Sequence, residues 1–85
     1  MIWILLPAYN EEVDLPRILA KIEEQMKGHE YRVVVINDGS TDATAEILAK
    51  FKGELHLDVI AHPINRGLGE TERDGFEYIA WRAQR

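Results

Sequence analysis

Two polar segments of the sequence, residues 7–12 and 37–42, hold residue types that are well suited to bind a ligand. The first reads Pro-Ala-Tyr-Asn-Glu-Glu and the second reads Asn-Asp-Gly-Ser-Thr-Asp. Each segment follows an apolar run and precedes a stretch whose apolar residues recur at helical spacing. This order predicts two loops at the carboxyl ends of two buried strands, where ligands bind in open α/β sheets.

An aromatic ring and a carboxylate in these segments can together form a pocket for a nucleotide base. The backbone of residues 7–12 and the ring of Tyr9 would make one wall. The carboxylate of Asp38 can accept hydrogen bonds from the N–H edge of uracil or guanine. We therefore expect the end of the second strand to face the base.

A purely structural role for the same residues is the alternative. Asn10 and Asp14 can satisfy backbone groups of a turn, and Asp14 is suited to cap the helix that follows. Ser40 or Thr41 can cap the next helix, with Asp42 in its first turn. Because local capping does not require the additional carboxylate of the second segment, this alternative leaves that group unexplained.

A third polar segment, residues 65–75, begins with a glycine-rich loop. Gly67 and Gly69 would let the backbone approach a phosphate, and Arg73 would face a diphosphate from the following helix. Gly75 lies inside that helix, where glycine often marks a close approach of backbone or ligand. A plain loop that closes onto a helix is the alternative, since an isolated Gly-x-Gly is weak evidence.

The apolar pattern predicts three strands that alternate with three helices. Continuous apolar or β-branched runs predict strands at residues 2–6 and 31–36, and a weaker pattern predicts a third strand from Leu55 to Ile60. Helices are expected up to about residues 28 and 52 and from residue 70 onward, with Phe76, Ile79 and Ala80 on one packed side of the last helix. The expected fold is a single α/β domain, residues 1–85, with a three-layer Rossmann-like βαβαβα order and a parallel three-stranded sheet.

Composition narrows the classes of partner. The apolar share is 46%, the formal net charge is −5, and no basic cluster occurs, so nucleic acid and anionic membranes are poor partners. No cysteine is present, which is compatible with the cytoplasm, and the apolar start is too short for a signal peptide or a membrane span. His29, His56 and His62 show no spacing typical of a metal site, so we expect them at the surface or at strand edges.

All three segments resemble motifs of family 2 glycosyltransferases, which have the GT-A fold. That family reads roughly P-x-Y-N-E-E, then V-D/N-D-G-S-x-D-x-T, then N-x-G-x-G-x-x-x-R-x-G-F. The matching positions are Pro7, Tyr9, Asn10, Glu11, Glu12, Val35, Asn37, Asp38, Gly39, Ser40, Asp42, Thr44, Asn65, Gly67, Gly69, Arg73, Gly75 and Phe76. Within the family the sequence looks most similar to the polyprenyl-phosphate branch, which includes dolichol-phosphate mannose synthase.

The resemblance implies a site for a UDP- or GDP-sugar and an inverting glycosyl transfer. The implied nucleotide-binding residues are Pro7, Ala8, Tyr9, Asn10, Glu11, Asp38, Gly39, Ser40, Gly67, Gly69 and Arg73. The sequence departs from the family at Leu68, where lysine is frequent, and at Glu70, which adds negative charge near the expected diphosphate.

The resemblance covers about the first half of the family's catalytic domain. The sequence contains no D-x-D motif, so no catalytic or metal-binding residue is assigned, and Mg²⁺ or Mn²⁺ is expected only together with a D-x-D segment. Comparison with the family therefore predicts a domain truncated before its fourth strand that does not transfer sugar alone. The alternatives are a non-catalytic nucleotide-binding module and a module that only self-associates.

The family fold also implies that the first strand becomes the edge of the sheet in this chain. An apolar edge strand that begins at Ile2 and ends at Leu6 is a template for pairing with another chain. We therefore expect a homodimer in which two first strands pair.

Overall fold

Three parallel strands form one sheet in the computed structural model, which describes residues 1–52 and 56–84. The strands are β1 (Ile2–Ala8), β2 (Tyr31–Asp38) and β3 (Leu57–His62), in the order β1-β2-β3. Ile2 of β1 lies opposite Tyr31, and Asp38 of β2 lies opposite His62. The predicted parallel three-stranded sheet is confirmed, and β1 is one of its edges.

The strands extend further toward the site than the sequence predicts. Pro7 was expected to end the first strand, but β1 continues through Pro7 to Ala8. Proline is tolerated there because β1 is an edge strand, where a missing N–H need not break a ladder. The predicted start of the third strand at Leu55 lies outside the described residues.

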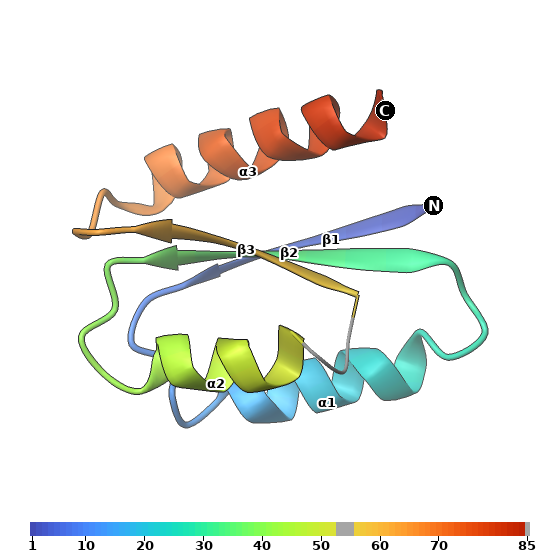
Figure 1. Ribbon diagram of the computed structural model, residues 1–85, viewed down its shortest axis with the longest axis horizontal. Helices are drawn as coiled ribbons and strands as arrows, with labels where there is room; N and C mark the ends of the chain where they lie inside the picture. Colours follow the sequence, from blue (N-terminus) through green and yellow to red (C-terminus); the bar gives the residue numbers. More distant parts are fainter. Residues whose placement is uncertain (53–55, 85) are drawn as a thin grey trace.

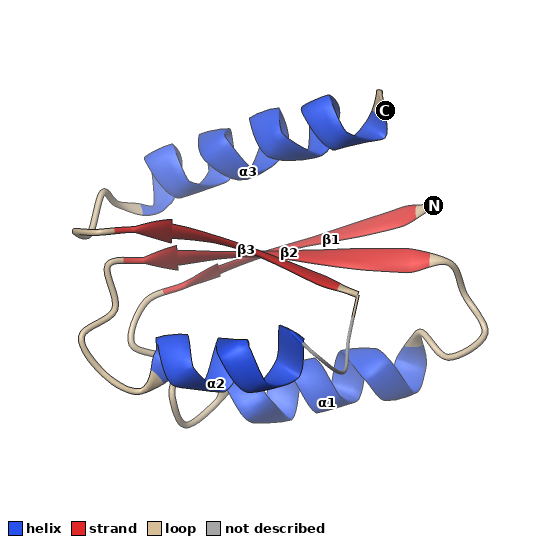
Figure 2. Ribbon diagram, in the orientation of Figure 1, coloured by secondary structure: helices blue, strands red, loops and turns tan. Residues whose placement is uncertain are grey.

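The helices are α1 (Leu15–Gln25), α2 (Thr44–Lys52) and α3 (Leu68–Ala83). Helices α1 and α2 cover one face of the sheet, and α3 lies alone on the other (Figure 1). Colouring by secondary structure shows the same three layers, with long loops where the strands end (Figure 2). The predicted βαβαβα order and three-layer arrangement are confirmed. Within the described residues, every helix is too short or too polar to cross a membrane.

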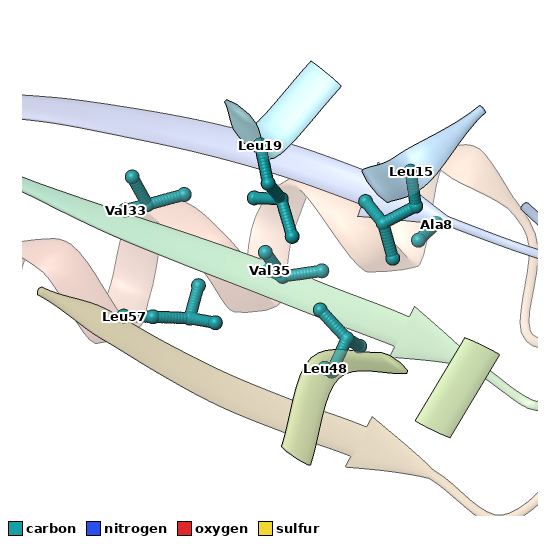
Figure 3. Close-up of a cluster of buried hydrophobic side chains, with 7 residues drawn as sticks. All are labelled: Ala8, Leu15, Leu19, Val33, Val35, Leu48 and Leu57. Atoms are coloured by element: carbon teal, nitrogen blue, oxygen red, sulfur yellow. The ribbon is translucent and has the colours of Figure 1, made fainter. Parts of the chain in front are cut away.

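The core lies between the sheet and the pair α1 and α2. Leu15 and Leu19 of α1 and Leu48 of α2 point onto Val33 and Val35 of the central strand (Figure 3). Four consecutive residues of β2, Val33 to Ile36, are fully buried. A continuous apolar run is what a central strand covered on both faces requires.

Helix α3 packs on the sheet through a side that only partly matches the predicted one. Its buried residues are Thr71 and Gly75, and Ile79 is half-buried, whereas Phe76 is 63% exposed and Ala80 is also exposed. A Cβ atom on Gly75 would come within 2.9 Å of Leu5 Cδ2. The helix therefore approaches β1 so closely that a larger residue would require the Leu5 side chain to shift, and the close contact expected at Gly75 is with this strand.

Candidate functional site

A pocket of about 210 Å³ lies at the carboxyl ends of the strands, where the three polar segments meet. Its walls come from the end of β1 and the loop after it, from the last residue of β2, and from the loop that leads into α3. The lining residues are Pro7, Ala8, Tyr9, Glu11, Asp38, Asn65, Gly67, Leu68 and Thr71. Segments far apart in the sequence thus form one site, at the edge of the sheet that the motifs predicted.

Six of the predicted site residues line this pocket, and five do not. Those in the lining are Pro7, Ala8, Tyr9, Glu11, Asp38 and Gly67. Those outside it are Asn10, Gly39, Ser40, Gly69 and Arg73. Asn65, Leu68 and Thr71 also line the pocket, although they are not among the predicted site residues.

The first two loops are fastened to each other by hydrogen bonds between backbone and side chains. The backbone N–H of Asn10 donates to Ser40 Oγ at 3.0 Å, and the N–H of Thr41 donates to Asn10 Oδ1 at 2.8 Å. The N–H of Glu11 donates to Thr44 Oγ1 at 3.0 Å. Asn10 has a φ of 52°, a left-handed conformation that asparagine tolerates better than most residues. Asn10 and Ser40 therefore hold the loops together behind the pocket wall.

The helix caps differ from those predicted. Asp42 rather than Ser40 or Thr41 accepts the hydrogen bond from the backbone N–H of Thr44, at 2.9 Å. The side chain of Asp14 does not cap α1, although Asp14 occupies the N-cap position. Its carboxylate instead lies 3.7 Å from Arg17 on the surface.

Gly39 allows the second loop, between β2 and α2, to pack directly on the third loop, between β3 and α3. Its φ is 72°, and an added Cβ would fall inside contact distance of the backbone of Ile64 and Asn65, with Ile64 Cα at 2.9 Å. A side chain at this position would push the third loop away. Gly39 thus shapes the pocket from outside its lining.

The carboxylate of Asp38 is buried and holds the third loop. It is 4% exposed, and Oδ1 accepts hydrogen bonds from His62 Nδ1 at 2.8 Å and from the N–H of Arg66 at 2.9 Å. Oδ2 accepts from the N–H of Gly67 at 3.0 Å. Burial opposes ionisation of Asp38, but these hydrogen bonds outweigh it and hold its pKa below the usual value. The Thr71 hydroxyl also hydrogen-bonds to this carboxylate and lowers its pKa.

We expected His62 at the surface or at a strand edge, without a functional role. The expectation of a surface position is wrong, because His62 is buried. His62 is the last residue of β3, and its ring is buried. Nδ1 lies 2.8 Å from Asp38 Oδ1, and Nε2 lies 2.7 Å from Asp74 Oδ2. The hydrogen bond with Asp38 raises the pKa of His62, burial lowers it, and the contact with Asp74 raises it further, so the net shift is upward. One signal could have found this residue: in a parallel register, a polar residue that ends β3 lies beside the one that ends β2.

Arg73 lies away from the pocket. Its side chain is 65% exposed, and its guanidinium is 3.7 Å from the carboxylate of Glu70 one turn earlier. Gly69 likewise has open space around it. The third motif reaches the pocket through Asn65 and through Gly67 at the start of α3.

The charged side chains that line the pocket are all acidic. Glu11 and Asp38 contribute carboxylates to the lining, which includes no lysine, arginine or histidine. In residues 1–52 and 56–84, no group of three or more side chains is placed to hold a metal ion. The described residues thus do not by themselves fit a divalent cation.

Comparison with known proteins gives matches over most of the chain. The sequence pattern of "Glycosyl transferase family 2" matches residues 3–80. An "Undecaprenyl-phosphate 4-deoxy-4-formamido-L-arabinose transferase" of Pseudomonas fluorescens (strain Pf0-1) is 36% identical over 69 residues, covering 79% of this chain and 20% of that protein. A "Dolichyl-phosphate beta-glucosyltransferase ALG5A" of Trichomonas vaginalis is 32% identical over 84 residues, covering 89% and 26%.

These relatives are much longer than the chain, which spans 20% and 26% of their lengths. Their names agree with the predicted resemblance to the polyprenyl-phosphate branch, since undecaprenyl and dolichyl groups are both polyprenyl chains. The family match extends through all three motifs, from Trp3 to Ala80. The chain therefore belongs to glycosyl transferase family 2.

Proposed function

We propose that the pocket binds the nucleoside part of a UDP- or GDP-sugar. One observation carries the proposal: residues from all three family motifs line a single pocket at the carboxyl ends of the strands. Its volume of about 210 Å³ is below the roughly 300–1,000 Å³ of sites that enclose a whole drug-sized ligand. It therefore suits a base and ribose, with the diphosphate and sugar outside.

Two groups in the pocket are suited to a base. The ring of Tyr9 is 47% exposed and can stack on a base, an interaction worth about 1–3 kcal/mol. The carboxylate of Asp38, which lines the pocket, can accept a hydrogen bond from the N–H edge of uracil or guanine. The alternative, that the motifs serve only turns and caps, does not account for the exposed ring in the pocket.

The start of α3 is the part of the pocket best suited to a phosphate. Gly67 is the N-cap residue, and Leu68 and Thr71 of the first turn also line the pocket. Backbone N–H groups at a helix N-terminus attract anions. Because Glu11 and Asp38 oppose that attraction, we expect weak affinity for a diphosphate without a cation, which a D-x-D segment elsewhere would have to hold.

The proposed role is the nucleotide-sugar-binding portion of an inverting glycosyltransferase that acts on a polyprenyl phosphate. Support for this acceptor comes from the relatives, whose names state transfer to undecaprenyl or dolichyl phosphate. Among the described residues we assign no general base. We therefore still predict that this chain alone does not transfer sugar. Measurable transfer from a UDP- or GDP-sugar by the purified chain would contradict it. A location in the cytoplasm also stays a prediction.

The binding proposal can be tested by NMR titration with UDP and GDP in the presence of Mg²⁺. We expect saturable shifts at Tyr9, Asp38 and Gly67. Tyr9→Ala should weaken binding about tenfold, the order expected for loss of one base–aromatic stack. Val13→Ala is the matched control, because Val13 is 72% exposed and lies outside the pocket. Absence of shifts at millimolar nucleotide would refute nucleotide binding.

We also propose a homodimer in which two β1 strands pair in antiparallel fashion. In the described residues β1 pairs with β2 alone, and Ile2 is 45% exposed. A hollow of about 390 Å³ lies between the end of β1 and α1, and its lining includes both acidic and basic side chains: Glu11, Asp14, Arg17 and Lys21.

Analytical ultracentrifugation tests the dimer. We expect association at high micromolar concentration, and Ile2→Lys should weaken it because charge on an edge strand opposes pairing. Val13→Lys adds the same charge at an exposed position outside the hollow and should not change the association. A monomer at all concentrations would refute the dimer.

A further inference from the structure

A buried histidine held between two carboxylates joins the pocket wall to the sheet and to α3. His62 ends β3 and is 8% exposed, Asp38 ends β2, and Asp74 belongs to α3. The two ring nitrogens lie 2.8 Å from Asp38 Oδ1 and 2.7 Å from Asp74 Oδ2. Three elements of the fold thus meet at one imidazole.

These two contacts require a doubly protonated ring. A neutral imidazole has one N–H donor and one bare nitrogen, and an ionised carboxylate is an acceptor only. A neutral His62 would therefore place a nitrogen lone pair against one of the two carboxylates. With the imidazolium, both contacts are charge-assisted hydrogen bonds, which are about twice as strong as neutral ones.

Asp38 transmits this arrangement to the pocket. The oxygen that contacts His62 also accepts the N–H of Arg66, and the other oxygen accepts the N–H of Gly67. Gly67 lines the pocket and begins α3, while Asp74 lies further along the same helix. The orientation of the Asp38 carboxylate therefore sets the position of the third loop.

We propose that His62 is a positioning residue of the nucleotide pocket, which in its doubly protonated form clamps Asp38 and Asp74 and holds the loop from Asn65 to Gly67 in the shape that receives the nucleotide. This inference rests on the proposed function, because it concerns the same pocket. It adds a dependence on pH that the three motifs do not contain.

The positive charge of protonated His62 offsets part of the negative charge around the ring. Asp38 and Asp74 face it as anions, and Arg66 lies 3.4 Å from Asp74 Oδ2 and 3.1 Å from Glu70. Glu77 and the hydroxyl-bearing ring of Tyr78 line a hollow on the open side of the ring, together with Ile60 and Trp81. Loss of the His62 proton increases the excess of negative charge in this cluster. As the pH rises through the raised pKa of His62, the clamp should open.

The first experiment follows the histidine rings and the loop amides of the chain by NMR as a function of pH. We expect His62 to keep both ring protons above pH 6.5, the ordinary pKa of histidine. The amides of Arg66 and Gly67 should shift with the same midpoint as His62. A His62 that is already neutral at pH 6.5 would overturn the inference.

The second experiment measures UDP and GDP affinity across the same pH range for the unmodified chain, His62→Gln and the matched control His29→Gln. We expect affinity to fall about tenfold as His62 loses its proton, the order expected for loss of one charge-assisted hydrogen bond. His29→Gln should keep this step, and His62→Gln should bind weakly and lack it. A step that persists in His62→Gln would refute the positioning role.

A second variant tests the inference independently, in case His62→Gln does not fold. Asp74→Asn keeps the shape of the side chain but removes its charge, so His62 should lose its proton at a lower pH and the affinity step should move with it. A step that stays in place would count against the inference. If neither nucleotide binds at any pH while the loop amides still follow His62, the proposed function fails but the clamp on the loop stands.

Discussion

Replacement of Gly39 by alanine tests how the second loop supports the third. Gly39 has a φ of 72°, and an alanine Cβ there would meet the backbone of Ile64 and Asn65. Backbone atoms cannot turn aside as a flexible side chain can. We therefore expect Gly39→Ala to displace the third loop from the pocket as well as to lower stability.

The magnitude follows from two separable costs. A left-handed conformation costs an L-residue with a Cβ about 1–2 kcal/mol. Alanine recovers about 0.4–1 kcal/mol of this by restricting the unfolded chain. Overpacking adds about 1–3 kcal/mol. The expected loss for Gly39→Ala is about 1–5 kcal/mol, a large part of the roughly 4–13 kcal/mol expected for a domain of this length.

Gly28→Ala separates the two costs. Gly28 has a φ of 85°, but an added Cβ would meet nothing within 4 Å. It should therefore cost about 1 kcal/mol or less, from the backbone conformation alone. The free energy of unfolding of both variants is measured by urea denaturation at one pH. Equal losses for the two variants would refute the claim that Gly39 is required by close loop packing.

Three further predictions concern charged groups and the pocket. Asp58→Asn should lower the free energy of unfolding by about 1–3 kcal/mol in urea denaturation, because Asp58 accepts two hydrogen bonds from the half-buried Arg32. Asp14→Asn on the surface should change the free energy of unfolding by less than about 0.5 kcal/mol. Equal effects of the two variants would contradict this prediction. The free energy of unfolding should fall as the pH rises through the raised pKa of His62, because the stabilisation from protonated His62 is complete only below the ordinary histidine pKa of 6.5. It should also fall in acid as Asp58, whose pKa is lowered by Arg32, becomes protonated. A flat profile above neutral pH would exclude the contribution of His62. Leu68→Lys should strengthen UDP binding about tenfold by calorimetry, since it places a cation in the pocket lining beside the α3 N-terminus, while Leu68→Met should leave binding unchanged.

The arrangement of strands and helices could be predicted because it follows from local patterns. The run Val33 to Ile36 is apolar without interruption, as a strand covered on both faces must be. Turn residues mark the ends of the elements, and parallel pairing then places the polar segments at one edge of the sheet. Six predicted residues consequently line the pocket.

The orientation of α3 could not be predicted from its apolar residues. Phe76, Ile79 and Ala80 have the spacing of a packed stripe, yet Phe76 is largely exposed. The packed side is set by Gly75 against Leu5 and by the polar contacts of Asp74 and Tyr78 with residues of β3. Such choices depend on tertiary contacts that a helical period does not contain.

The caps and the buried histidine were missed for a related reason. Ser40, Thr41 and Asp42 are all good capping residues, and contacts with Asn10 across the two loops decide which of them caps α2. His62 has its partners 24 and 12 positions away, where no local motif relates them. Spacing rules for metal sites do not detect a histidine that bonds to carboxylates.

The hydrogen bonds that fasten the first two loops join residues 30 to 33 positions apart. They cannot form while the chain folds one element at a time, because β1 and β2 must first be aligned through the intervening helix. The entropic cost of such long-range closure comes before any gain from the contacts. The pocket should therefore be among the last parts of the chain to assemble during refolding, after the sheet has formed around β2.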